Sequence, residues 1–222
     1  MTARRHHYLS QCYLKAFAVA RKKSYHTTVF DARTRRIYQT NVENVGIVRD
    51  FNRIQVEGYE PDTIEKALAE FEGELGPALE RVITARTMRS HDDRALILNF
   101  MCMLAIRTPR LRETMREFTE RVSNQMMQLA LATKERWEGQ VRKATAAGYM
   151  KSDRGITYEQ MKEFVDRGEY RLEIANEHHL GMEFNTFDKV LETFFGRKWV
   201  VLRSSATSGG FIARPPAVPL LD

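Results

Sequence analysis

Apolar residues at helical spacing dominate the middle of this chain and limit the folds that it can adopt. One stripe follows Pro61, recurs every three or four positions, and consists of Ile64, Leu68, Phe71, Leu75, Leu79 and Val82. This spacing predicts an amphipathic helix over residues 62–83 whose apolar face needs a partner. Residues 94–107, which follow the polar caps at 91–93, are apolar on nearly every side, which is typical of a helix at the centre of a helical layer. A third pattern predicts one long helix over residues 109–146, with Thr108 as its N-cap and Pro109 in its first turn.

Short β patterns lie at the two ends of the chain. Residues 25–31 and 36–40 are rich in β-branched and aromatic side chains and flank a polar turn, which predicts a hairpin. Further strands are expected at residues 53–56, 199–202 and 211–212, and further helices after the capping-box sequence at 157–160 and over residues 184–195. The fold class is therefore predicted to be α+β and predominantly helical. We expect a small antiparallel sheet formed by the N-terminal hairpin and the C-terminal strands, within a single domain over residues 1–222.

Positive charge is concentrated near the N-terminus. The chain has a formal net charge of +6, and residues 1–50 contain ten Lys and Arg against three Asp and Glu. Six of these cations form two clusters, Arg21, Lys22 and Lys23, and Arg33, Arg35 and Arg36. Such clusters are either solvated loop tips or a surface that attracts nucleic acid or an acidic protein. The first functional hypothesis is therefore a binding or interaction module with a basic N-terminal face, associated with nucleic acid and needing no cofactor.

Several classes of protein are disfavoured by what the sequence lacks. No apolar run approaches the roughly 20 residues of a membrane span, and the N-terminus has no apolar signal region, so a cytoplasmic protein without a membrane partner is expected. Cys12 and Cys102 both lie among apolar residues and are expected to be buried thiols. No phosphate-binding loop, GxGxxG, GxSxG or kinase motif occurs, which disfavours nucleotide hydrolysis and ordinary acyl transfer.

The opening string His7-Tyr8-Leu9-Ser10-Gln11-Cys12-Tyr13-Leu14-Lys15-Ala16-Phe17 is unusually rich in aromatic residues and histidine for a chain terminus. It resembles the opening signature of the family domain of unknown function 4238 (DUF4238), in which a His-Tyr-Val-Pro-Gln-like string runs into Tyr-Leu and Phe. Similar short elements are Arg49-Asp50-Phe51, Arg107-Thr108-Pro109 and Trp199-Val200-Val201-Leu202, so the resemblance covers about residues 6–212. The family has no established activity. The resemblance implies that the opening string is held in the core, against the helices predicted at residues 62–83 and 94–107.

Two positions depart from the family pattern. Ser10 stands where the family has Pro, so a turn fixed by proline is not expected here. The family continues Phe-Ile with a Thr-Ser-Asp-x-Pro-like string and a further helical segment, whereas here residues 213–222 form a divergent tail. The resemblance implies a shortened domain that exposes apolar surface near Trp199, Phe194 and Phe211, and we expect it to self-associate.

The alternative hypothesis is a metal-dependent hydrolase or nuclease centred on His7 with Asp50 and Glu65. A neutral imidazole can bind a divalent metal or act as a general base, and carboxylates can complete such a site. His7 can instead lock the N-terminus onto the core by a backbone hydrogen bond. Arg107 can bind an anion or form a clamp with Glu65 between two helices. Whether the protein is an enzyme stays open at this point.

Overall fold

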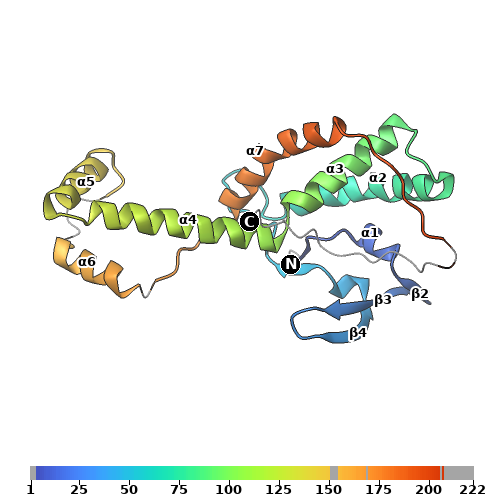
Figure 1. Cartoon of the computed structure of the whole chain (residues 1–222), viewed down its shortest axis with the longest axis horizontal. Helices are drawn as coiled ribbons and strands as arrows, with labels where there is room; N and C mark the ends of the chain where they lie inside the picture. The colour runs from blue at the N-terminus through green and yellow to red at the C-terminus, as the bar shows by residue number, and fades with distance from the viewer. Residues whose placement is uncertain (1–3, 151–154, 169, 206, 208–222) are drawn as a thin grey trace. The chain divides into compact units, whose positions relative to one another are not determined.

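The computed structural model describes residues 4–150, 155–168, 170–205 and 207, which form two compact units (Figure 1). The first unit consists of the chain up to Arg112 together with the chain from Ala175 onward, and the second consists of residues 113–174. The described residues are mainly helical with two small antiparallel sheets, so the predicted α+β class is confirmed. That the chain is a single domain stays a prediction.

Both sheets of the described residues come from the first 49 positions. A two-stranded sheet pairs β1 (Arg5–His7) with β5 (Ile47–Arg49), and a three-stranded sheet has the order β2 (Val19–Arg21), β3 (Ser24–Asp31) and β4 (Arg36–Asn41). The predicted hairpin is confirmed as β3 and β4. The strands β1, β2 and β5 were not predicted, because three-residue strands are too short to show a periodic pattern. A 3₁₀ turn at Val42–Asn44 leads from β4 to β5.

The turns of the three-stranded sheet are built without glycine. The Asp31 carboxylate accepts hydrogen bonds from the backbone N–H groups of Arg33 and Thr34 and from the Thr34 hydroxyl, which fixes the β3–β4 turn. Arg35 in this turn has φ +54°, and Lys22 in the β2–β3 turn has φ +49°. Residues other than Gly and Asn are strained in this left-handed region of backbone conformation.

Three helices form the layer of the first unit. They are α2 (Thr63–Ala85), α3 (His91–Ile106) and α7 (Asn176–Phe195), and α3 packs against both others. The helices predicted at residues 62–83, 94–107 and 184–195 are therefore confirmed, although Ser90 rather than residues 91–93 caps α3. Within the described residues, no helix is both long and apolar enough to cross a membrane.

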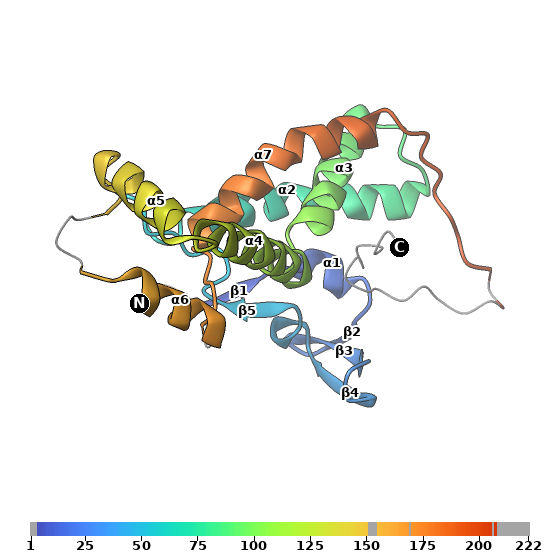
Figure 2. The ribbon, with the colours of Figure 1, turned by 60° about the vertical axis from the view of Figure 1, so that its left-hand side comes forward.

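The opening string lies in the core of the first unit, as predicted. Its short helix α1 (Gln11–Lys15) contacts α2 and β3 and lies between the helices and the strands (Figure 2). The Tyr13 ring lies 5.4 Å from that of Phe100 in α3. Tyr13 and Cys12 pack on the cluster centred on Leu75 and Phe100, so the first residues of the chain close the helical core.

In the second unit, the regular elements of the described residues are helices. Here the prediction of one helix over residues 109–146 is wrong: α4 (Pro109–Ala130) and α5 (Lys134–Ala146) are separate. The break occurs because the Thr133 side chain accepts a hydrogen bond from the Arg136 N–H and starts a new helix. The predicted capping box is confirmed at Thr157, where α6 (Tyr158–Arg167) begins, and the Tyr158 hydroxyl donates to the Leu131 carbonyl at 2.9 Å.

For the described residues 199–202, the predicted pairing of the hairpin with C-terminal strands is wrong. Residues 199–202 have no regular secondary structure, because Trp199 turns back on the end of α7 and donates its indole N–H to the Phe194 carbonyl at 2.7 Å. The strand predicted at residues 211–212 lies outside the described residues, as does the tail from residue 213. Residues 53–56 form no strand either, since the Ile54 N–H donates to the Pro61 carbonyl and the Gln55 N–H donates to the Glu177 carboxylate.

Candidate functional site: a buried polar network and an exposed basic sheet

Polar side chains from four elements meet in the interior of the first unit. His6 in β1 is 1% exposed, and its Nδ1 accepts a hydrogen bond of 2.8 Å from the Asn52 N–H. A backbone N–H can only donate, so Nδ1 is the unprotonated nitrogen of that ring. His6 Nδ1 also lies 3.6 Å from the Glu65 Oε1 in α2. The histidine that contacts Asn52 and Glu65 is thus His6. The sequence favoured His7, and a functional role of His7 stays a prediction.

Asn52 connects the acidic and basic members of this network. Its side chain is fully buried, donates through Nδ2 to Glu65 Oε1, and accepts through Oδ1 from Arg107 Nη2 at 2.9 Å. The predicted clamp of Glu65 and Arg107 therefore runs through an amide. Burial lowers the pKa of Arg107, whose side chain is 12% exposed.

Glu183 in α7 compensates the buried positive charge. Its carboxylate accepts two hydrogen bonds from Arg112, at 2.6 and 3.0 Å, and lies 3.9 Å from Arg107 Nε. The Arg112 guanidinium also donates to the Phe51 carbonyl and stacks on the Phe51 ring, 3.6 Å from its centroid. Planar bidentate pairing of this kind is the strongest form of ion pair in proteins. The sequence indicated neither Asn52 nor Glu183.

His7 lies at a small cavity that adjoins this network at Arg107. The cavity has a volume of about 20 Å³ and is lined in part by His7, Ser10, Glu72 and Arg107. The His7 Nε2 is buried and has no hydrogen-bond partner among the described residues. Burial lowers the pKa of His7 and raises that of Glu72. A cavity of this size has room for one water-sized molecule, which is too little for an organic substrate.

The predicted catalytic residues have other partners. The Asp50 carboxylate accepts two hydrogen bonds from Arg4, at 3.1 and 2.6 Å, which hold its pKa below the usual value. Glu65 is engaged with Asn52. Among the residues that the structure describes, no group of three or more His, Cys, Asp and Glu side chains could hold a metal ion. A catalytic set of His7, Asp50 and Glu65 therefore stays a prediction, and the contacts of Asp50 and Glu65 do not favour it.

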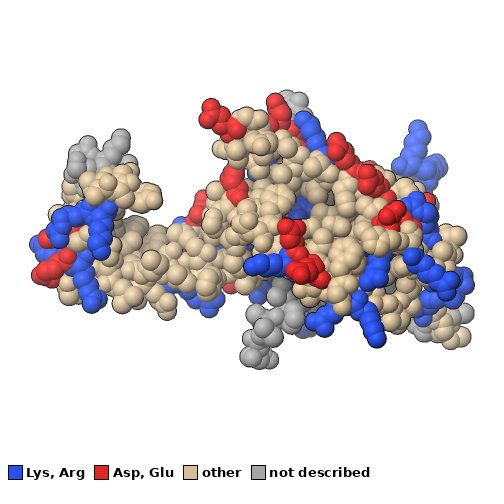
Figure 3. Space-filling model, turned by 90° about the horizontal axis from the view of Figure 1, so that it is seen from above, with Lys and Arg blue, Asp and Glu red and all other residues tan. Residues whose placement is uncertain are grey.

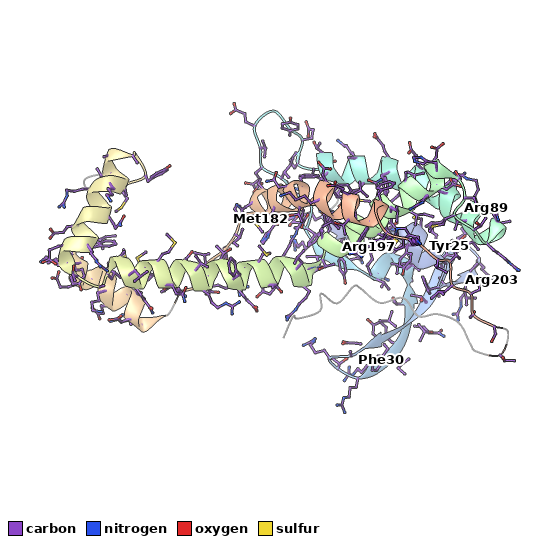
Figure 4. All side chains as sticks on the ribbon, turned by 45° about the horizontal axis from the view of Figure 1, so that its top comes forward. Tyr25, Phe30, Arg89, Met182, Arg197 and Arg203 are labelled. Carbon is purple, nitrogen blue, oxygen red and sulfur yellow. The ribbon has the colours of Figure 1, made fainter. Side chains whose placement is uncertain are left out.

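The three-stranded sheet has one partly covered face and one open face. On the partly covered face, the Thr27 hydroxyl donates to the Phe17 carbonyl and the Lys15 amine lies over the Tyr25 ring. Tyr25 and Tyr38 on this face are 40% and 49% exposed. The register of the strands puts a different set of side chains on the open face, including Phe30 and Ile37, which are directly paired and 61% and 72% exposed. We call this surface the open sheet face; its exposed side chains are Val19, Arg21, Thr28, Phe30, Ile37 and Gln39. Figure 4 shows Phe30 at the part of the sheet remote from the helices, whereas Tyr25 lies close to them.

Both turns that flank the open sheet face carry exposed cations. The six side chains make no ion pair within 4.0 Å among the described residues, and they are Arg21, Lys22, Lys23, Arg33, Arg35 and Arg36. The turns lie at opposite ends of β3, which separates them by about 25 Å. Figure 3 shows a face on which both basic and acidic side chains lie around a larger area of other residues.

Comparison with known proteins gives a family but no activity. The family model described as "Protein of unknown function (DUF4238)" matches residues 5–213. The chain belongs to this family. Neither the curated proteins nor the solved structures contain a match to it.

Three of the four short DUF4238-like elements lie in or next to the buried network. The opening string directly follows His6, whose ring accepts a hydrogen bond from the Asn52 N–H. The Phe51 carbonyl accepts a hydrogen bond from the Arg112 guanidinium, which stacks on the Phe51 ring. Arg107 donates a hydrogen bond to the Asn52 side chain. At the position where the DUF4238 signature has proline, Ser10 is the N-cap residue of α1, and its hydroxyl lies 2.9 Å from the Cys12 Sγ. The elements that mark the family thus hold the N-terminus to the helices in this member. The open sheet face also lies within the residues that the family model matches.

Proposed function

We propose that the protein binds single-stranded nucleic acid on the open sheet face, with its phosphates held by the cations of the two flanking turns. The single observation that carries this proposal is an exposed aromatic ring, Phe30, on a sheet whose two ends carry cations without ion pairs. Surfaces that bind single strands combine these two parts: bases stack on aromatic rings and a positive track follows the backbone.

The conformation of the turns supports this proposal. Lys22 and Arg35 occupy left-handed positions where Gly or Asn is more stable, at a cost of about 1 kcal/mol each. A cation at a strained position is unexpected if the turn serves only to connect two strands. It is expected if the charge itself is required at the tip of the turn.

The main test measures affinity for a labelled oligo(dT) of about 12 nucleotides at several salt concentrations. Replacing Arg33, Arg35 and Arg36 by Gln should weaken binding and lower the slope of log K against log salt by about 2. Each contact to a single strand contributes about 0.7 to that slope. Replacing all six turn cations by Gln should abolish binding.

A matched control removes the same charge elsewhere. Arg136, Arg142 and Lys143 are exposed on α5, and their replacement by Gln changes the net charge equally. This control should retain the affinity and the salt slope of the unaltered chain. Equal losses in both triple variants would show a nonspecific charge effect and contradict the proposal. Displacement of the oligonucleotide by polyglutamate at equal charge concentration would favour an acidic protein as partner, and would also contradict it.

A second variant tests the role of the ring. Phe30→Leu keeps an apolar side chain of similar exposure but removes the stacking surface. It should weaken oligo(dT) binding by about 10-fold, since stacking of one base contributes about 1–3 kcal/mol. The salt slope should stay unchanged, because the phosphate contacts remain. If Phe30→Leu binds as tightly as the unaltered chain, bases do not stack on this face.

A further inference from the structure

A pocket of about 360 Å³ lies in the first unit, away from the sheets. It is formed by the end of α2, the turn to α3, the start of α3, and the segment that follows α7, which Figure 1 shows descending past that turn. Its lining residues are Arg86, Thr87, Met88, Arg94, Trp199, Val200 and Val201. The volume lies within the range of small-molecule sites in proteins.

Two cations without counterions line this pocket. No Asp or Glu contributes to the lining, and neither Arg86 nor Arg94 makes an ion pair within 4.0 Å among the described residues. The Arg94 Nε is buried and has no hydrogen-bond partner there. Asp93 is adjacent in sequence, but its carboxylate accepts hydrogen bonds from Arg81, and its backbone N–H donates to the Ser90 side chain. The two guanidinium groups are therefore free to bind an anion.

The backbone at Arg86 adds an independent observation. Arg86 ends α2 in the left-handed region with φ +57°, at the position where helices most often have glycine. Arginine is less stable than glycine in this conformation. The chain therefore accepts strain at the residue that brings one of the two cations to the pocket.

The other lining residues are mainly apolar, and one of them, Trp199, has fixed contacts. Trp199 is held by the hydrogen bond from its indole N–H to the Phe194 carbonyl and by edge contact with the Phe194 ring at 5.6 Å. Met88 and Val201 also line the pocket. An indole ring held in this way offers a surface for a planar or apolar group.

We propose that this pocket binds a small phosphorylated molecule of about mononucleotide size. Its phosphate contacts Arg86 and Arg94, and its planar part lies against Trp199. Phosphate is favoured over a neutral group because two guanidinium forks without a carboxylate present two positive charges and donors suited to its oxygens. This site is separate from the open sheet face and does not depend on the function proposed for it.

The experiment uses the full chain and calorimetric titration with AMP, adenosine and inorganic phosphate. AMP should bind most tightly, phosphate more weakly and adenosine least, because both the anion and the ring contribute. Arg94→Gln should weaken AMP binding by about 10- to 100-fold, the loss expected when hydrogen bonds to a charged group are removed. Trp199→Leu should weaken AMP binding but leave the affinity for inorganic phosphate unchanged.

Arg86→Gly separates binding from folding. Glycine relieves the strained conformation, so this variant should be at least as stable as the unaltered chain and yet bind AMP about 10-fold more weakly. Arg89→Gln, an exposed cation of the same turn that does not line the pocket, should bind AMP normally. The proposal is overturned if none of the three probes binds, if adenosine binds as tightly as AMP, or if Arg86→Gly and Arg94→Gln retain full affinity.

Discussion

The first unit contains two sets of cations whose surroundings are opposite. Arg107 and Arg112 are buried and hydrogen-bonded to Asn52, Glu183 and a backbone carbonyl. Lys22 and Arg35 are exposed, occupy strained turn positions and make no ion pair among the described residues. A buried charge requires partners because it has lost its hydration, whereas an exposed charge stays available to a ligand. The comparison therefore separates cations that hold the fold together from cations that are free to act.

The strongest test of this comparison removes the counterion of the buried set. Glu183→Gln leaves the Arg112 guanidinium buried beside a neutral amide, and it should lower the free energy of unfolding by about 3–5 kcal/mol. Urea unfolding measures this loss. The matched control is Glu192→Gln, which changes an exposed carboxylate of the same helix and should stay within about 0.5 kcal/mol. A small loss in Glu183→Gln would mean that the pair contributes little to the fold.

The amide that connects the network should have the next largest effect. Asn52→Ala removes the acceptor of Arg107 and the donor to Glu65, and it should destabilise the protein by about 2 kcal/mol. Asn185→Ala, which changes an exposed amide in α7, serves as the control and should have almost no effect. If both variants unfold at the same urea concentration, the Asn52 side chain does not couple Glu65 to Arg107.

The two sets also differ in how far the sequence could predict them. The hairpin and the helices at residues 62–83 and 94–107 follow from local patterns, and these predictions are confirmed. The buried network depends on pairs such as Arg112 and Glu183, which lie 71 positions apart and carry no shared motif. The strand predicted at residues 199–202 failed because the Trp199 contact with Phe194 overrides its β propensity. Likewise, nothing local indicates that α2, α3 and the segment after α7 enclose a pocket with two cations.

Glu72 is an intermediate case, a half-buried acid at the small cavity. Burial raises its pKa, so the folded state binds a proton more tightly than the unfolded state does. The stability of the protein should therefore fall as the pH rises from the unfolded pKa, near 4.5, through the raised folded value. Glu72→Gln should remove this part of the pH dependence. Urea unfolding at several pH values measures it, and an identical profile for both proteins would contradict the assignment to Glu72.

The smallest expected effect belongs to the free cations, and its sign distinguishes the two sets. Arg35→Gly and Lys22→Gly relieve left-handed strain and should each raise the free energy of unfolding by about 0.5–1 kcal/mol. Ala32→Gly in the β3–β4 turn has no positive φ to relieve and should instead be neutral or destabilising, because glycine loses more conformational freedom on folding. Arg35→Gly and Lys22→Gly should also bind oligo(dT) less tightly, because each removes a phosphate contact. A cation whose removal stabilises the fold and weakens binding is retained for the ligand. If Arg35→Gly and Lys22→Gly destabilise the protein, the turn cations contribute to the fold as the buried ones do, and the distinction between the two sets fails.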